Sequence, residues 1–149
     1  MTSADVAALQ QEIHAGIPLS QAMGFEITDL DGHAISVTAP LAPNVNVHST
    51  GFAGSLYAVG ILTGWGLVRH LIRCRGLTAE LVVAEAGIRY RAPVRGDITC
   101  RCAVPKGQAE TFVAQLESAG RARLVIEVSI GRAGAARLTA TMAAQVAAD

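Results

Sequence analysis

The chain has 149 residues, and its 12 Lys plus Arg balance its 12 Asp plus Glu, so the formal net charge is zero. This length predicts one domain, residues 1–149, with a proper hydrophobic core, and the balanced charge argues against a nucleic-acid partner. The three cysteines fit neither a disulfide framework nor the usual zinc spacings. We therefore expect reduced thiols, no metal, no cofactor and a cytoplasmic location.

Hydrophobic periodicity predicts the elements in chain order. Residues 4–14 carry an apolar stripe at helical spacing, and two segments that alternate apolar and polar residues follow them. The longest predicted helix ends in a basic cluster, which suits the C-terminal end of a helix dipole. The predicted helices are residues 4–14, 54–73 and 109–120, and the predicted strands are residues 24–30, 33–39, 79–92, 98–104, 124–130 and 138–146.

An uncharged run from Gly51 to Val68 is long enough to raise the question of a membrane span. Its glycines, Ser55 and Thr63 argue against a span, and the remaining chain consists of amphipathic strands that have their own core to cover. A helix that is apolar all round can instead be buried on every side within one domain. We favour that interpretation and predict no membrane span.

The pattern predicts an α+β fold in which six antiparallel strands surround one long central helix. Most connections between the strands are too short for parallel crossovers. The last two strands form a predicted hairpin, because the segment GRAGAA between them contains two glycines that can adopt positive φ.

Two segments carry a resemblance to a known family. NVNVHSTGFAGSLYAV (44–59) resembles the loop and helix start of hotdog-fold acyl-thioester enzymes, and GIRYRAPVRGDITC (87–100) is similar to their next strand-turn-strand. The resemblance covers nearly the whole chain and implies a hotdog fold. It is closest to the thioesterase-domain branch found C-terminal to acetyltransferase-like domains, which includes malonyl-acyl carrier protein decarboxylases.

Two positions depart from the pattern that the resemblance implies. Asn46, Thr50 and Gly54 fall on matching residues, and Ala53 falls on a glycine. However, Phe52 stands where the pattern has His. Ile61 stands where the thioesterases have their helix Asp. The acid that would activate water for hydrolysis is therefore missing.

The missing acid favours a different reaction. Thioester hydrolysis needs a base near the attacking water, whereas decarboxylation of a malonyl thioester needs a poorly solvated carboxylate and fixed donors for the enolate oxygen. A helix carboxylate about 4 Å from malonate would repel it by roughly 4 kcal/mol at an effective dielectric near 20. An uncharged helix thus suits malonyl decarboxylation better than hydrolysis.

Candidate catalytic groups lie in the loop and at the helix start. The Asn46 amide and the backbone N–H groups of Gly54 and Ser55 are the predicted donors, since a helix N-terminus favours an anion. Asn44 is a further candidate, although loop asparagines commonly bond to their own backbone. Ser55 could equally be an ordinary helix-start hydroxyl.

Candidate substrate-binding residues surround these donors. His48 could contact a substrate carboxylate or be solvated, and Glu85 is kept as a base only for the thioesterase alternative. Arg89 and Arg91, with Arg95 nearby, could hold a pantetheine phosphate or an acidic carrier protein, or form a solvated strand face. The remaining predicted lining residues are Thr50, Phe52 and Ile61.

Three function classes stay open: a malonyl-thioester decarboxylase that supplies acetyl-acyl carrier protein for fatty acid synthesis, an acyl-CoA or acyl-carrier-protein thioesterase, and a non-catalytic acyl-thioester binder. Unpaired sheet edges and a long apolar helix predict at least a homodimer, which could pair again into a tetramer. The resemblance implies that Asn46 and the Gly54 helix start face the segment from Glu85 to Tyr90 of another subunit.

Overall fold

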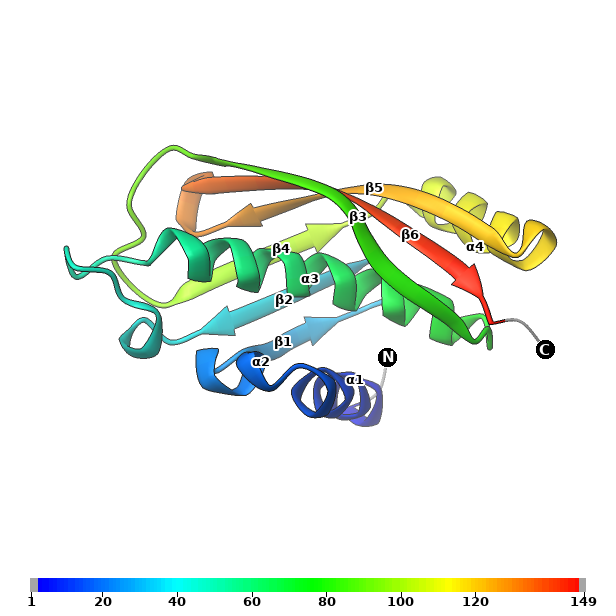
Figure 1. Ribbon diagram of the computed structural model, residues 1–149, viewed down its shortest axis with the longest axis horizontal. Coiled ribbons are helices and arrows are strands. Elements are labelled where there is room, and N and C mark those ends of the chain that lie inside the picture. The colour runs from blue at the N-terminus through cyan, green and yellow to red at the C-terminus, as the bar shows by residue number, and fades with distance from the viewer. Residues whose placement is uncertain (1–2, 148–149) are drawn as a thin grey trace.

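The computed structural model describes residues 3–147, in which a six-stranded antiparallel sheet wraps around the long helix α3 (Ala53–Cys74), as Figure 1 shows. The strand order is β1-β2-β4-β5-β6-β3, and every pairing is antiparallel. The predicted α+β hotdog architecture is confirmed. The strands are β1 (Glu26–Leu30), β2 (Ala34–Ala39), β3 (Ala79–Tyr90), β4 (Ile98–Ala103), β5 (Arg121–Ile130) and β6 (Ala136–Val146).

The strands bury one face each because apolar residues recur at every second position. In β5, Leu124, Ile126 and Val128 are buried against α3 while the residues between them are mostly exposed. The predicted hairpin of β5 and β6 is confirmed, and both strands begin earlier than predicted, since Arg121 already pairs with Gln145. Ladder hydrogen bonds thus extend these strands beyond their most apolar residues.

Helix α3 lies close against the sheet because it presents glycines there. A Cβ on Gly60 would stand 2.7 Å from Cδ1 of Ile130, and one on Gly64 would overlap Cδ1 of Ile126. By length and composition α3 is the one described helix that could cross a membrane, yet 67% of its most apolar window is buried inside the fold. In this structure α3 is the core helix of the domain, as the sequence predicted.

Two helices precede the sheet. Helix α1 (Ser3–Gly16) was predicted, and its Glu12 forms ion pairs with Arg69 and Arg73 of α3. The short helix α2 (Pro18–Met23) was not predicted, because six residues are too few for a helical period. Pro18 in its first turn and Gly24 beyond its end, with φ of +71°, were the available signals.

Helix α4 (Lys106–Ala119) packs across β5 at the far end from the start of α3 (Figure 1). Its buried Phe112, Val113 and Leu116 are the predicted apolar residues. Arg75 at the end of α3 joins it through ion pairs with Glu110 and Glu117 at 3.5 and 3.1 Å. Two short 3-10 turns, η1 (Ala42–Asn44) and η2 (Arg132–Gly134), complete the described elements.

Strand β3 forms one edge of the sheet and pairs only with β6 among the described strands. A bulge interrupts this pairing between Val83 and Glu85. Gly87 pairs regularly with Thr139, so no second bulge turns Glu85 inward. Ala86 and Ile88 pack against the core, so Glu85 lies on the opposite, exposed face.

Candidate functional site

The Asn46 side chain closes the loop that leads into α3. Its Oδ1 accepts hydrogen bonds from the backbone N–H groups of His48 and Thr50 at 2.8 and 3.1 Å. Its Nδ2 donates to Oγ1 of Thr50 at 2.9 Å and to the carbonyl of Gly51 at 3.2 Å. Both amide hydrogens are thus used within the loop, so the contacts give Asn46 a positioning role. Direct donation from Asn46 to a substrate stays a prediction.

Asn44 is buried, with 1% of its surface exposed. Its Nδ2 donates to the carbonyls of Met23 and Pro40, both at 2.8 Å, and its own carbonyl accepts the Phe52 N–H at 2.8 Å. Its Oδ1 has no hydrogen-bond partner within the part of the chain that the structure describes. These contacts fasten the loop to the end of α2 and to the residue after β2, and a catalytic role for Asn44 is an untested prediction.

The start of α3 presents open backbone donors. The N–H of Leu56 is bonded to the Phe52 carbonyl at 3.0 Å, but within residues 3–147 no acceptor is found for the N–H groups of Ala53, Gly54 and Ser55. Unpaired N–H groups and the helix dipole together favour an anion at this point. Of the predicted donors, the N–H groups of Gly54 and Ser55 are therefore unpaired, whereas the Asn46 amide is not.

The Phe52 ring lies against Gly54. A Cβ on Gly54 would stand 2.5 Å from Cε2 of this ring, so the residue must be glycine for the ring to remain there. The ring itself is 52% exposed. It covers one side of the helix start.

Tyr90 was not singled out as a site residue from the sequence, yet it contacts the helix start. Its hydroxyl donates to the Ala53 carbonyl at 2.8 Å, and burial, followed by the neighbouring Tyr57, raises the pKa of Tyr90. The sequence offered one signal for Tyr90: it lies two positions after Ile88, on the same face of a predicted strand and near its end. The Gly51 N–H donates to the Val94 carbonyl at 2.7 Å, so β3 and the segment after it hold both the loop and the helix.

Tyr57, Ile61 and Trp65 form a row on α3, a helix that carries no carboxylate of its own. These three residues are four positions apart, partly buried, and packed against the core, and α3 contains neither Asp nor Glu. Glu85 is exposed on the outer face of β3. The structure therefore brings Thr50, Phe52, Gly54 and Ser55 together and leaves Glu85 apart from them.

The predicted Arg89 and Arg91 flank Tyr90 but line a different surface from the open N–H groups of α3. They line a hollow of about 490 Å³ on the outer face of the sheet, together with Glu127 and Arg137. His48 is exposed at the tip of the loop. A substrate-binding role for these three residues stays a prediction.

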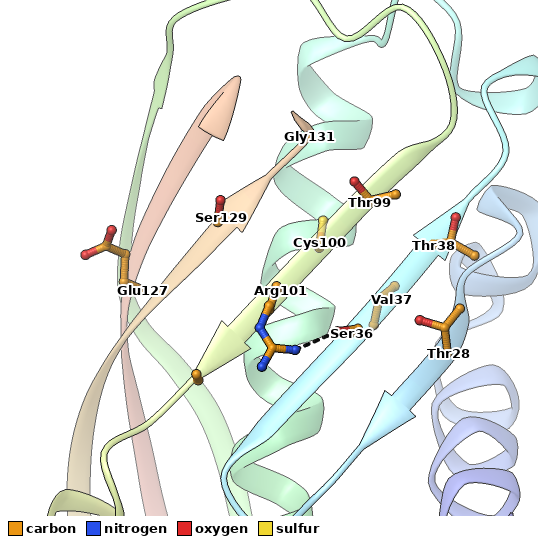
Figure 2. A pocket seen from close by; sticks show the side chains of 11 residues that line it. Thr28, Ser36, Val37, Thr38, Thr99, Cys100, Arg101, Glu127, Ser129 and Gly131 are labelled. Carbon is orange, nitrogen blue, oxygen red and sulfur yellow. Dashed lines mark hydrogen bonds between the residues drawn. The ribbon is translucent and has the colours of Figure 1, made fainter. Parts of the chain in front are cut away.

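A separate hollow of about 860 Å³ lies on the face of the sheet opposite α3, as Figure 2 shows. It is lined mainly by hydroxyl side chains of β1, β2, β4 and β5, including Thr38, Thr99 and Ser129. Nη1 of Arg101 donates to Oγ of Ser36 at 3.0 Å within it. None of the predicted site residues lines this hollow, so we assign it no part in the candidate site.

The antiparallel sheet wrapped around one long helix makes this a hotdog-fold protein. The family model described as "Putative thioesterase (yiiD_Cterm)" matches residues 6–144, so the chain belongs to this family.

Solved structures support the same assignment. A Chlorobaculum tepidum protein of unknown function is 30% identical, with a TM-score of 0.91 over 95% of this chain and 94% of its own. A Shewanella oneidensis protein, described as a "putative thioesterase", is 31% identical, with a TM-score of 0.87 over 98% of this chain and all of its own. A Pseudomonas aeruginosa protein, described as a "probable thioesterase", is 19% identical with a TM-score of 0.79 over 95% of each chain, and this likeness concerns the fold alone.

Proposed function

We propose that the protein is an enzyme of acyl thioesters that decarboxylates malonyl-acyl carrier protein to acetyl-acyl carrier protein, a primer for fatty acid synthesis. One observation carries the proposal: the open N–H donors of Gly54 and Ser55 stand at the start of a helix that contains no carboxylate. A cytoplasmic location belongs to the same proposal.

In this mechanism the thioester carbonyl oxygen accepts hydrogen bonds from the N–H groups at the start of α3. The bond between the malonyl methylene carbon and its carboxylate breaks, CO₂ leaves, and the electron pair moves into an enolate whose oxygen carries the charge. Fixed donors stabilise this charge as it develops. A proton from water then reaches the methylene carbon and gives the acetyl thioester, so no protein base is needed.

Surroundings without charge favour this reaction. Tyr57, Ile61 and the Phe52 ring offer the departing carboxylate little solvation, and an acid at position 61 would repel it. The loop residues Asn46 and Thr50 hold Gly51 and thereby the direction of the helix start. In this proposal they act as positioning residues.

The alternative function is thioester hydrolysis, which the family description favours. Hydrolysis needs a base for the attacking water. Glu85 would have to supply it from another subunit, because in its own protomer it lies on the outer face of β3.

We further propose that the working unit is a homodimer that pairs along β3. This strand is an exposed edge of 12 residues, and Val82 and Tyr90 on it are 57% and 48% exposed. An exposed edge invites pairing with another strand. Such pairing would also cover the partly buried row of α3 and complete the pocket. Sedimentation at micromolar concentration measures the oligomeric state, and activity is followed as the protein is diluted. A monomer with full activity would contradict the proposal that two subunits share the pocket.

Product analysis tests the function directly. The protein is incubated with malonyl and acetyl thioesters of both coenzyme A and acyl carrier protein, and released CO₂ is measured separately from released thiol. We expect CO₂ from the malonyl thioesters without thiol. Release of thiol without CO₂ would show that the protein is a thioesterase instead. Release of neither product would favour a non-catalytic acyl-thioester binder.

A matched pair of variants tests the donors. Ser55→Pro removes the backbone N–H in the first helical turn, where no hydrogen bond within the helix is lost. Ser55→Ala keeps that N–H. We expect CO₂ release at least tenfold slower in Ser55→Pro than in Ser55→Ala, and equal rates would exclude this donor.

A further inference from the structure

Five arginines gather at the end of the molecule where α3 begins, and we call them the arginine surface: Arg89, Arg91, Arg95, Arg132 and Arg137. They come from the end of β3, the connection from β3 to β4, and the turn and strand after β5. Figure 1 places these segments together at one end of the sheet, beside the start of α3. The whole chain has zero formal net charge, so this end is locally basic.

Two acids lie among these arginines, Asp97 in the hollow of Arg95 and Arg132 and Glu127 in the other hollow, so the surface keeps an excess of positive charge. Arg137 pairs with Glu127, but within residues 3–147 the other four arginines form neither an ion pair nor a side-chain hydrogen bond. Arg89 and Arg137 stand directly opposite each other in the register of β3 and β6. Like charges in this position destabilise a sheet, and Glu127 offsets part of this repulsion through its ion pair with Arg137. The charge of Arg89 stays available to a partner outside the protein.

The shape of the surface favours an extended partner. The arginines line two separate hollows, one of about 490 Å³ with Arg89, Arg91 and Arg137, and one of about 680 Å³ with Arg95 and Arg132. A single phosphate is best held by donors that converge on it. Guanidinium groups divided between two hollows instead match carboxylates spaced along a protein surface, such as one face of an acidic helix.

The arginine surface is joined to the candidate site through the backbone. Arg91 and Arg95 flank the segment of Val94, whose carbonyl accepts the Gly51 N–H at 2.7 Å. Arg132 follows Gly131, where a Cβ would stand 3.1 Å from Cγ2 of Val94. A partner seated on this surface would therefore lie next to the loop and the start of α3, within reach of a flexible arm.

We infer that the arginine surface docks the acidic face of acyl carrier protein and directs its thioester arm toward Gly54. The inference rests on the proposed function for the identity of the cargo. It goes further by naming the residues that dock the protein carrier, and its test separates docking of the carrier protein from binding of free coenzyme A.

A binding titration tests this without any thioester. Labelled apo acyl carrier protein, which lacks the phosphopantetheine arm, is titrated with the intact protein and followed by fluorescence anisotropy. We expect saturable binding that weakens with salt and that is at least tenfold weaker in Arg95→Glu/Arg132→Glu. The matched control is Arg121→Glu/Arg123→Glu, which makes the same charge change on exposed arginines at the other end of β5, and we expect its affinity to stay within twofold.

Three outcomes would overturn the inference: no binding of apo carrier protein, equal losses in both double variants, or variants that weaken only free coenzyme A, which would assign the arginines to a phosphate. Because the apo carrier protein has no thioester, its result is independent of turnover. Docking without CO₂ release would refute the proposed function alone, and CO₂ release without docking would refute this inference alone.

Discussion

The Tyr90 hydroxyl donates a 2.8 Å hydrogen bond to the carbonyl of Ala53 and so ties the end of β3 to the first turn of α3. Tyr90→Phe removes this bond and little else. We expect the free energy of unfolding to fall by about 1 kcal/mol, since a net hydrogen bond contributes roughly that much. The kcat for the thioester reaction should fall several-fold because the donors are less well fixed. Parallel denaturation and rate measurements check both effects, and an unchanged kcat would show that Tyr90 has no positioning role.

Ile61→Asp introduces the acid that the helix lacks. A carboxylate at this partly buried position would repel malonate, so we expect CO₂ release to drop at least tenfold, and thiol release could appear in trace amounts. Ile61→Asn is the control, because it adds polarity without charge. If Asp raises decarboxylation, or if Asn is equally inactive, the repulsion argument is wrong.

Asn46→Asp removes the amide donor and places a carboxylate oxygen against the Gly51 carbonyl. We expect turnover to be abolished while circular dichroism reports an intact fold. Thr50→Val keeps the Asn46 amide but removes its Oγ1 partner, so a positioning role predicts a clear loss of kcat in this variant too. Wild-type rates in Asn46→Asp would remove Asn46 from the mechanism. Loss in Asn46→Asp alone would support direct donation.

Gly60→Ala places a methyl group against Cδ1 of Ile130. We expect the free energy of unfolding to fall by up to about 2 kcal/mol, because overpacking costs roughly 1–3 kcal/mol and the gain in helix propensity returns roughly 1 kcal/mol. Ile130→Val removes that Cδ1 and should rescue part of the loss in the double variant. Gly66→Ala is the control, since its nearest neighbour stands at 3.4 Å and no loss is expected. Additive effects of Gly60→Ala and Ile130→Val would contradict this packing.

His70 predicts how stability responds to acid. Burial is the main cause that lowers the pKa of His70, and 2% of the residue is exposed. The unfolded chain therefore binds the proton first as pH falls below about 6.5, and stability should decline from there toward the folded-state pKa. His70→Gln should flatten the change in unfolding free energy between pH 7.5 and 5.5. An equal slope in both proteins would assign the dependence to other groups.

Local periodicity in the sequence was sufficient to predict the strands and the buried central helix. The short connections between the strands predicted that they pair antiparallel. Alternation in segments such as LVIEVSI and the uncharged run after Gly51 reflect burial on one or all sides, which each element displays by itself. The absence of an acid at Ile61 was equally visible, because it depends on one residue in one helix.

Only the tertiary structure decided which groups face the candidate site. Asn46 turns its amide into its own loop, and the bulge before Glu85 leaves that acid on the outer face. Tyr90 reaches Ala53 across 37 positions of the chain, and the arginine surface combines three separate segments. These contacts depend on the register of the strands and on which hydrogen-bond partners folding brings within reach. Neither of these leaves a periodic pattern in the sequence.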